Sequence, residues 1–249
     1  MMYRARRLTR RILLVILSFL TVAACDHPET PAVDTPPWGI SFRWSADPGI
    51  DLESAEMKVV RATIESNTVA MFLSVDYGYP GWKDADTDNV DSDASAPHAM
   101  VEGIGTAYLH VVKYQTAGGE VNVVCKDMTN TAKKIGDKYP LPNQNDPRET
   151  LEAIAINVGG TFTADSAHLD PTKTPEGPDI PGPQGRHPRP QRNVFSQFSF
   201  AFYPHGGLQY RDLCLPWAES RWGGPQPPKP TRTESEPPKI EPFTPGWTE

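Results

Sequence analysis

The sequence predicts an α+β domain in which an N-terminal helix packs on a curved antiparallel sheet built from hairpins. Three observations favour this class: a helical pattern over residues 52–73, a strand hairpin over residues 104–127 and a second hairpin over residues 194–215. Proline-rich segments without hydrophobic periodicity flank these elements, and we expect such tails to be disordered.

The helix is predicted over about residues 52–73, where neither Gly nor Pro interrupts the chain. Asp51 is the expected N-cap, because a carboxylate there accepts a hydrogen bond from a free N–H group of the first turn. The residues that recur at helical spacing are mostly apolar: Met57, Val60, Ile64, Asn67 and Met71. We therefore expect this face of the helix to pack on the sheet.

The strands are predicted from alternation between two faces. Residues 106–114 alternate, Gly118-Gly119 lies in the expected turn, and residues 121–126 form the return strand. A third strand is predicted within residues 153–163. The last hairpin pairs residues 194–203 with residues 208–215, and three aromatic residues of its first strand fall on one face as expected core: Phe198, Phe200 and Phe202.

The first 24 residues have the pattern of an export signal. Five arginines precede an apolar run at residues 12–20, and small residues then lead to Cys25. This ending resembles the lipobox of bacterial lipoproteins, and the resemblance implies that the Cys25 thiol receives a diacylglyceryl group before the signal is cut. The alternatives are an ordinary signal peptide with a chance cysteine, or an uncleaved anchor. Residues 9–13 also resemble a twin-arginine motif, although the strongly apolar run favours the general secretion route.

Lipidation of Cys25 would place the protein on the extracytoplasmic face of the cell membrane. Removal of residues 1–24 takes five arginines from a chain of net charge −7 and leaves about −12, which argues against nucleic acid as a partner. The mature chain then has a flexible tether at residues 25–37 and one domain at residues 38–222. A proline-rich insertion at about residues 171–190 interrupts this domain, and a proline-rich tail follows at residues 223–249.

The order of one helix followed by long hairpins is similar to that of the nuclear-transport-factor-two-like, or SnoaL-like, superfamily. The resemblance covers the helix at residues 52–73 and the hairpins at 104–127 and 194–215, and it depends on element order alone. It implies a cone-shaped domain. The insertion at 171–190 and the lack of a clear second helix depart from the family pattern.

The chain contains three cysteines, and lipidation of Cys25 would leave Cys125 and Cys214 as a pair in an oxidising compartment. Both are predicted near the ends of return strands, so a disulfide between them is expected. Two buried free thiols are the alternative.

The sharpest polar cluster begins at Asp84, Asp86 and Asp88 and resembles a calcium loop, in which oxygen ligands at alternate positions surround the ion. Asn89 replaces the expected Gly and Ser95 replaces the bidentate Glu, so a solvated acidic loop is the alternative.

His110 is the only histidine in a clearly predicted strand, and with Asp76 or Asp212 it would form an acid–base pair if its face lined a cavity. A hydrogen-bonded structural histidine is the alternative. The sequence contains no phosphate-binding loop, zinc-ligand spacing or nucleophile elbow.

The leading hypothesis is therefore an exported, lipid-anchored cell-envelope protein with a non-catalytic binding or scaffold role and no cofactor. Its partners would be the membrane, through the anchor, and an envelope protein or a small ligand. Two alternatives stay open: a small-molecule enzyme with an interior pocket around His110, and an accessory subunit of a secretion or conjugation apparatus.

Overall fold

The computed structural model describes four stretches: residues 37–87, 100–159, 174–203 and 207–248. The export signal, Cys25 and nearly all of the tether lie outside the described residues, and so does Asp88. The expectations for those residues stay predictions. None of the helices in the described stretches is long and apolar enough to cross a bilayer.

A five-stranded open sheet is the centre of the fold. Its strands are adjacent in chain order: β1 (Trp38–Ala46), β2 (Gly103–Thr116), β3 (Gly119–Lys133), β4 (Leu151–Gly159) and β5 (Ser199–Tyr203). The predicted first hairpin is confirmed as β2 and β3, and the predicted third strand is confirmed as β4. Helices and a sheet in one domain agree with the α+β class.

The first strand corrects two predictions. The helix was expected to open the domain and the sheet to be entirely antiparallel, but β1 precedes the helix and pairs in parallel with β2. The sheet is therefore mixed. A parallel pair needs a crossover connection, and the helix α1 (Ala55–Phe72) forms part of it. Alternate residues of β1 are buried against α1: Trp38, Ile40, Phe42 and Trp44.

Helix α1 confirms the predicted element, with a different start. Ser54, not Asp51, is the N-cap, because its hydroxyl accepts the Met57 N–H at 3.3 Å. Asp51 instead accepts the Glu53 N–H and closes the turn before the helix. A 3-10 turn η1 (Val75–Tyr77) and the short helix α2 (Trp82–Ala85) follow α1.

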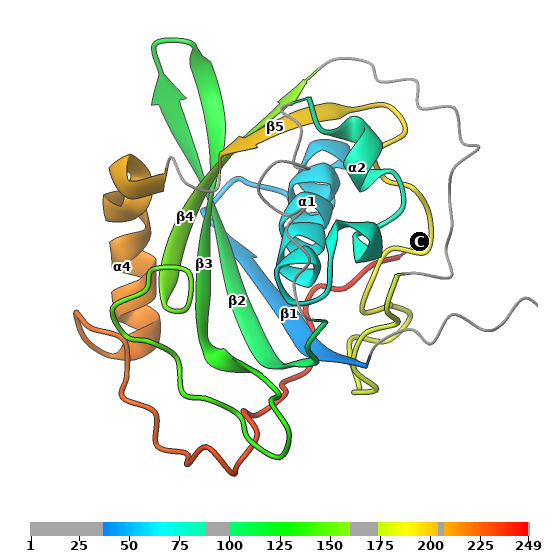
Figure 1. Ribbon diagram of the computed structural model, residues 1–249. Coiled ribbons are helices and arrows are strands. Elements are labelled where there is room, and N and C mark those ends of the chain that lie inside the picture. The colour runs from blue at the N-terminus through cyan, green and yellow to red at the C-terminus, as the bar shows by residue number, and fades with distance from the viewer. Residues whose placement is uncertain (1–36, 88–99, 160–173, 204–206, 249) are drawn as a thin grey trace, which may run out of the picture. The chain divides into compact units, whose positions relative to one another are not determined.

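The second predicted hairpin is wrong in its return strand. Residues 207–222 form a 3-10 turn, η3 (Gly207–Tyr210), and helix α4 (Arg211–Trp222). Cys214 and Ala218 are four residues apart and therefore lie on one face of the helix, which is buried on the sheet. Figure 1 shows α1 and α4 on opposite sides of the sheet, which gives three layers. Two residues of the aromatic stripe, Phe200 and Phe202, are confirmed as core in β5, whereas Phe198 precedes the strand and is half-buried against the core.

The tail is part of the domain, so the prediction of a disordered tail is wrong for residues 223–248. Thr244 forms two backbone hydrogen bonds with the edge of β1. Its N–H donates to the Phe42 carbonyl at 3.2 Å, and its carbonyl accepts from the Trp44 N–H at 2.8 Å. Trp247 is 2% exposed, and its backbone forms two bonds with His187 in the proline-rich insertion. Aromatic anchors thus compensate for the missing periodicity of a proline-rich segment.

Candidate functional site

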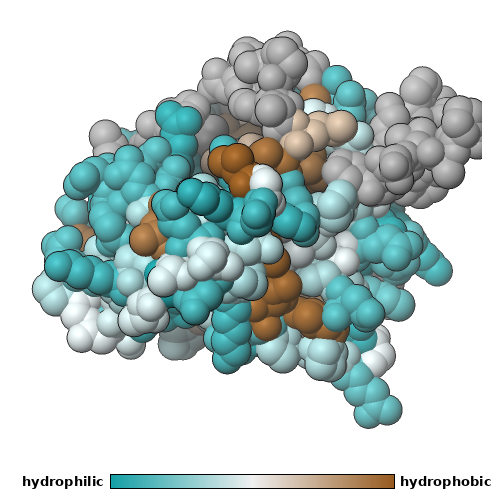
Figure 2. Space-filling model, turned by 60° about the horizontal axis from the view of Figure 1, so that its bottom comes forward, coloured by the Kyte–Doolittle hydropathy of each residue, from teal (hydrophilic) through white to brown (hydrophobic). Residues whose placement is uncertain are grey.

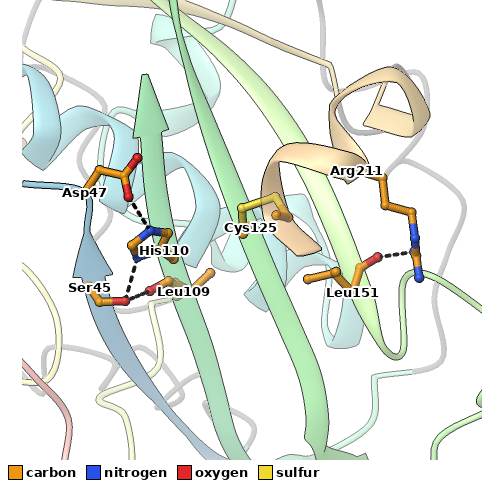
Figure 3. Close-up of a disulfide and its surroundings, with 8 residues drawn as sticks. Ser45, Asp47, Leu109, His110, Cys125, Leu151 and Arg211 are labelled. Carbon is orange, nitrogen blue, oxygen red and sulfur yellow. Dashed lines mark hydrogen bonds and ion pairs between the residues drawn. A yellow bond between two sulfur atoms is a disulfide. The ribbon is translucent and has the colours of Figure 1, made fainter. Parts of the chain in front are cut away.

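Cys125 lies in β3 and Cys214 in α4, with Cα atoms 5.4 Å apart and sulfur atoms at bonding distance (Figure 3). Both side chains are fully buried between the sheet and α4. The expected pairing therefore agrees with the geometry, although Cys214 comes from a helix and not from a return strand.

His110 lies beside this pair, opposite Cys125 in the β2–β3 ladder (Figure 3). Its Nδ1 is 2.9 Å from Ser45 Oγ, and its Nε2 is 3.1 Å from Asp47 Oδ1. The carboxylate at His110 is thus Asp47, so the expected pairing with Asp76 or Asp212 is wrong. The imidazole also stacks on Trp217 of α4, with ring centroids 5.3 Å apart.

These contacts favour a structural histidine. The ring is 8% exposed, both nitrogens have partners, and the Ser45 hydroxyl also lies 3.2 Å from the Leu109 carbonyl, to which it can donate. His110 faces α4, where its ring stacks on Trp217. These contacts join β1, β2 and α4. Ser45 and Asp47 were not predicted as partners of His110 because the sequence analysis did not predict β1.

Residues 88–95 of the expected calcium loop lie outside the described residues, so calcium binding stays a prediction. Asp84 lies in helix α2, and Asp86 forms an isolated bridge with Phe200 of β5. Asp88 lies outside the described residues. In the part of the chain that the structure describes, no three His, Cys, Asp or Glu side chains are grouped to hold a metal ion.

A buried polar cluster, not predicted from the sequence, surrounds Glu65 in the middle of α1. Its Oε1 accepts a hydrogen bond from Trp44 Nε1 at 2.7 Å. Its Oε2 accepts from the Tyr79 hydroxyl at 2.7 Å and from Trp247 Nε1 at 3.1 Å. Arg61, one turn earlier, is fully buried, donates to the Gly246 carbonyl at 2.6 Å and lies over the Trp247 ring.

Burial dominates the electrostatics of this cluster. It raises the pKa of Glu65 to about 7, although the Arg61 charge and the three hydrogen-bond donors oppose the shift. Burial and the neighbouring Glu65 raise the pKa of Tyr79 well above its ordinary value. The protein's own tail contributes Trp247 and the Gly246 carbonyl to this cluster, so the cluster fastens the C-terminal segment.

The C-terminal end of α1 borders an open groove of about 370 Å³. Three elements form its walls: the last turn of α1, the end of β3 and the chain that connects β3 to β4. The apolar lining includes Met71, Phe72, Met128, Ala132, Ile135 and Leu141. Figure 2 shows apolar side chains gathered on this lower face among hydrophilic ones.

Hydrogen bonds hold the wall formed by residues 134–150. The Thr150 carbonyl accepts from the Met128 N–H at 3.0 Å, which ties the end of the wall to β3. Arg232 of the tail donates to the carbonyls of Tyr139 and Pro140, and the Tyr139 N–H donates to the Glu234 carbonyl at 2.7 Å. These bonds fix the position of this wall against β3 and the tail.

Four charged residues complete the lining: Lys133, Asp146, Arg148 and Glu149. Asp146 Oδ1 accepts the Arg148 N–H at 2.9 Å, and Glu149 Oε2 accepts the Asn143 N–H. Lys133 makes a cation–π contact with Phe72 at 5.7 Å. The groove thus combines an apolar interior with charged groups, as small-molecule sites commonly do.

We found no match among protein-family models, curated proteins or solved structures. The resemblances to bacterial lipoproteins and to the SnoaL-like superfamily accordingly remain predictions. The groove was not predicted either, and its only sequence signals are Ile135 and Leu141, apolar residues in a connection that is otherwise polar and proline-rich.

Proposed function

We propose that this protein is an exported, lipid-anchored cell-envelope protein with a non-catalytic binding role, and that it binds a small apolar ligand in the groove. The groove at the end of α1 is the observation that carries the proposal. The anchor at Cys25 is proposed on the signal-like sequence alone.

The size and lining of the groove support a small ligand. Sites for small molecules have volumes of about 300–1,000 Å³ and are mainly apolar, with a few polar groups. A volume of about 370 Å³ falls at the lower end of this range. Ile135 and Leu141 remain 58% and 39% exposed, so the apolar wall is open to solvent and a ligand would remove apolar surface from water.

A titration with the neutral fluorescent probe N-phenyl-1-naphthylamine tests the binding role. We expect saturable binding of one probe per protein, weakened about tenfold by Ile135→Asp and by Leu141→Asp, because a buried carboxylate opposes an apolar ligand. Met100→Asp is the matched control, since Met100 is 57% exposed and lies outside the groove lining. Absence of saturable binding, or equal loss in all three variants, would contradict the role.

The anchor requires a separate test. Cells grown with an alkyne analogue of palmitate are expected to label the wild-type protein and to leave Cys25→Ser unlabelled. Membrane fractionation should retain the wild-type protein and release the variant. Label on the Cys25→Ser protein would refute the assignment of that residue.

An apolar segment of an envelope protein is the competing occupant of the groove. A protein segment bound there would keep the probe out of the groove, and small apolar molecules would not displace that segment. The same probe titration, repeated with the partner present, measures this. Such an outcome would support the scaffold role in place of the ligand-binding one.

A further inference from the structure

We propose that the ligand of the groove is a single-chain amphiphile with an anionic head group, whose apolar chain fills the groove while Lys133 and Arg148 bind the head. The inference rests on the proposed binding role and adds the chemical class of the ligand.

The two cations have unused hydrogen-bonding capacity. Within the described residues, neither the Lys133 ammonium nor the Arg148 guanidinium contacts a carboxylate or carbonyl oxygen. The Lys133 ammonium lies over the Phe72 ring, which itself lines the groove. A guanidinium is well suited to a carboxylate or phosphate, because its N–H groups can form two parallel bonds with the oxygens.

Each of the two carboxylates, in contrast, accepts a backbone N–H with one of its oxygens. Asp146 accepts the Arg148 N–H, and Glu149 accepts the Asn143 N–H. These bonds shape the turn that forms the wall. The side-chain donors that remain available in the groove therefore belong to the cations, which favours an anionic over a cationic head.

The volume indicates a ligand with one chain. A groove of about 370 Å³ suits a free monoacyl anion better than a two-chain membrane lipid. The mature chain has a net charge of about −12, so long-range attraction does not favour an anion. Recognition would depend on the local cations, and both are exposed, so it should weaken as salt is added.

Displacement of N-phenyl-1-naphthylamine from the intact mature domain tests the inference with three competitors of equal chain length: decanoate, decanol and decylamine. We expect decanoate to compete about tenfold more strongly than decanol, and decylamine to be the weakest. Lys133→Gln and Arg148→Gln should each reduce decanoate affinity about fivefold, as expected for exposed ion pairs, and leave decanol affinity unchanged. Lys229→Gln, an exposed change in the tail outside the groove, is the control and should have no effect.

The outcomes separate the inference from the proposed function. Equal competition by decanoate and decanol, or strongest competition by decylamine, would overturn the anionic head while the groove remained a binding site. Binding to phosphatidylglycerol vesicles without displacement by decanoate would overturn the single-chain ligand. No displacement by any of the three would contradict the binding role itself. The wild-type comparison of head groups does not depend on whether the variants fold.

Discussion

The middle and the last turn of helix α1 meet proline-rich chain in opposite ways. In the middle of the helix, Arg61 and Glu65 are buried beneath the tail, and Trp247 fills the space and donates to the carboxylate. At its last turn, Met71 and Phe72 border a groove that no described segment fills. The polar groups of the first site are nearly all used by the protein, whereas the cations of the second are not.

This difference distinguishes a structural cluster from a candidate ligand site. A buried charge is stable only when neighbouring groups compensate for the water it has lost, and the tail supplies such groups at Glu65. Lys133 and Arg148 of the groove lining are exposed, so water solvates their charges. Changes at the first site should therefore alter stability, and changes at the second should alter binding.

The largest loss of stability is expected on the opposite face of the sheet. That face serves as a reference for the two sites on α1. Replacement of Cys125 and Cys214 by serine opens a link across a sequence separation of 89 residues, and the chain-entropy model gives a loss of about 4–5 kcal/mol in the free energy of unfolding. Urea denaturation measures the loss. Thiol titration of the unreduced protein should find both sulfurs blocked; two reactive thiols after unfolding would show that no bond forms.

Trp247→Ala should remove about 3–5 kcal/mol from the free energy of unfolding, because it leaves a cavity and deprives Glu65 of a donor. Trp247→Phe keeps most of the ring and should cost about half as much. Urea denaturation of the three proteins gives the comparison. If both variants unfold like the wild-type protein, the tail does not fasten the domain.

Stability should also depend on pH through Glu65. The pKa of this carboxyl is raised from 4.5 in the unfolded chain to about 7 in the folded one, so the folded state holds the proton more tightly. The contribution is fully present below pH 4.5 and falls by about 3 kcal/mol as the pH rises through 7.

Urea denaturation at pH values from 4.5 to 8.5 measures this dependence. Other carboxyl groups also titrate at the acidic end, so the informative quantity is the difference between the wild-type protein and Glu65→Gln. The variant should lose the decline between pH 4.5 and 7. Parallel pH profiles of the two proteins would show that Glu65 does not titrate in this range.

The smallest effect on stability is expected in the groove. Leu141→Asp should change the free energy of unfolding by about 0.5 kcal/mol or less, because the side chain is 39% exposed. The same variant should still weaken probe binding about tenfold. A stability loss as large as that of Trp247→Ala would show that the groove, like the Glu65 cluster, is a structural site.

The sequence allowed prediction of the elements whose periodicity is long and uninterrupted. Helix α1 and the β2–β3 hairpin were predicted because their patterns extend over several turns or strand pairs. Residues 208–215 were mistaken for a strand, since a short apolar segment fits either period, and the helix is fixed by burial of Cys214 and Ala218 on the sheet.

The rest depends on contacts between distant segments, which composition does not reveal. The proline-rich tail folds because Trp247 meets Glu65, which lies 182 residues away in sequence. The groove likewise requires the end of α1 to meet β3 and its following connection. His110 was singled out correctly as a strand residue, but its partner Asp47 became visible only with β1.

The most direct test of the groove is a methyl NMR titration of the protein, labelled with ¹³C at its methionine methyl groups, with decanoate. Met71 and Met128 line the groove, Met57 is buried at the other end of α1, and Met100 is exposed outside the lining. The account predicts saturable shifts of Met71 and Met128 with Met57 and Met100 unchanged. Unchanged Met71 and Met128 signals at saturating decanoate, or equal shifts of all four methionines, would contradict it.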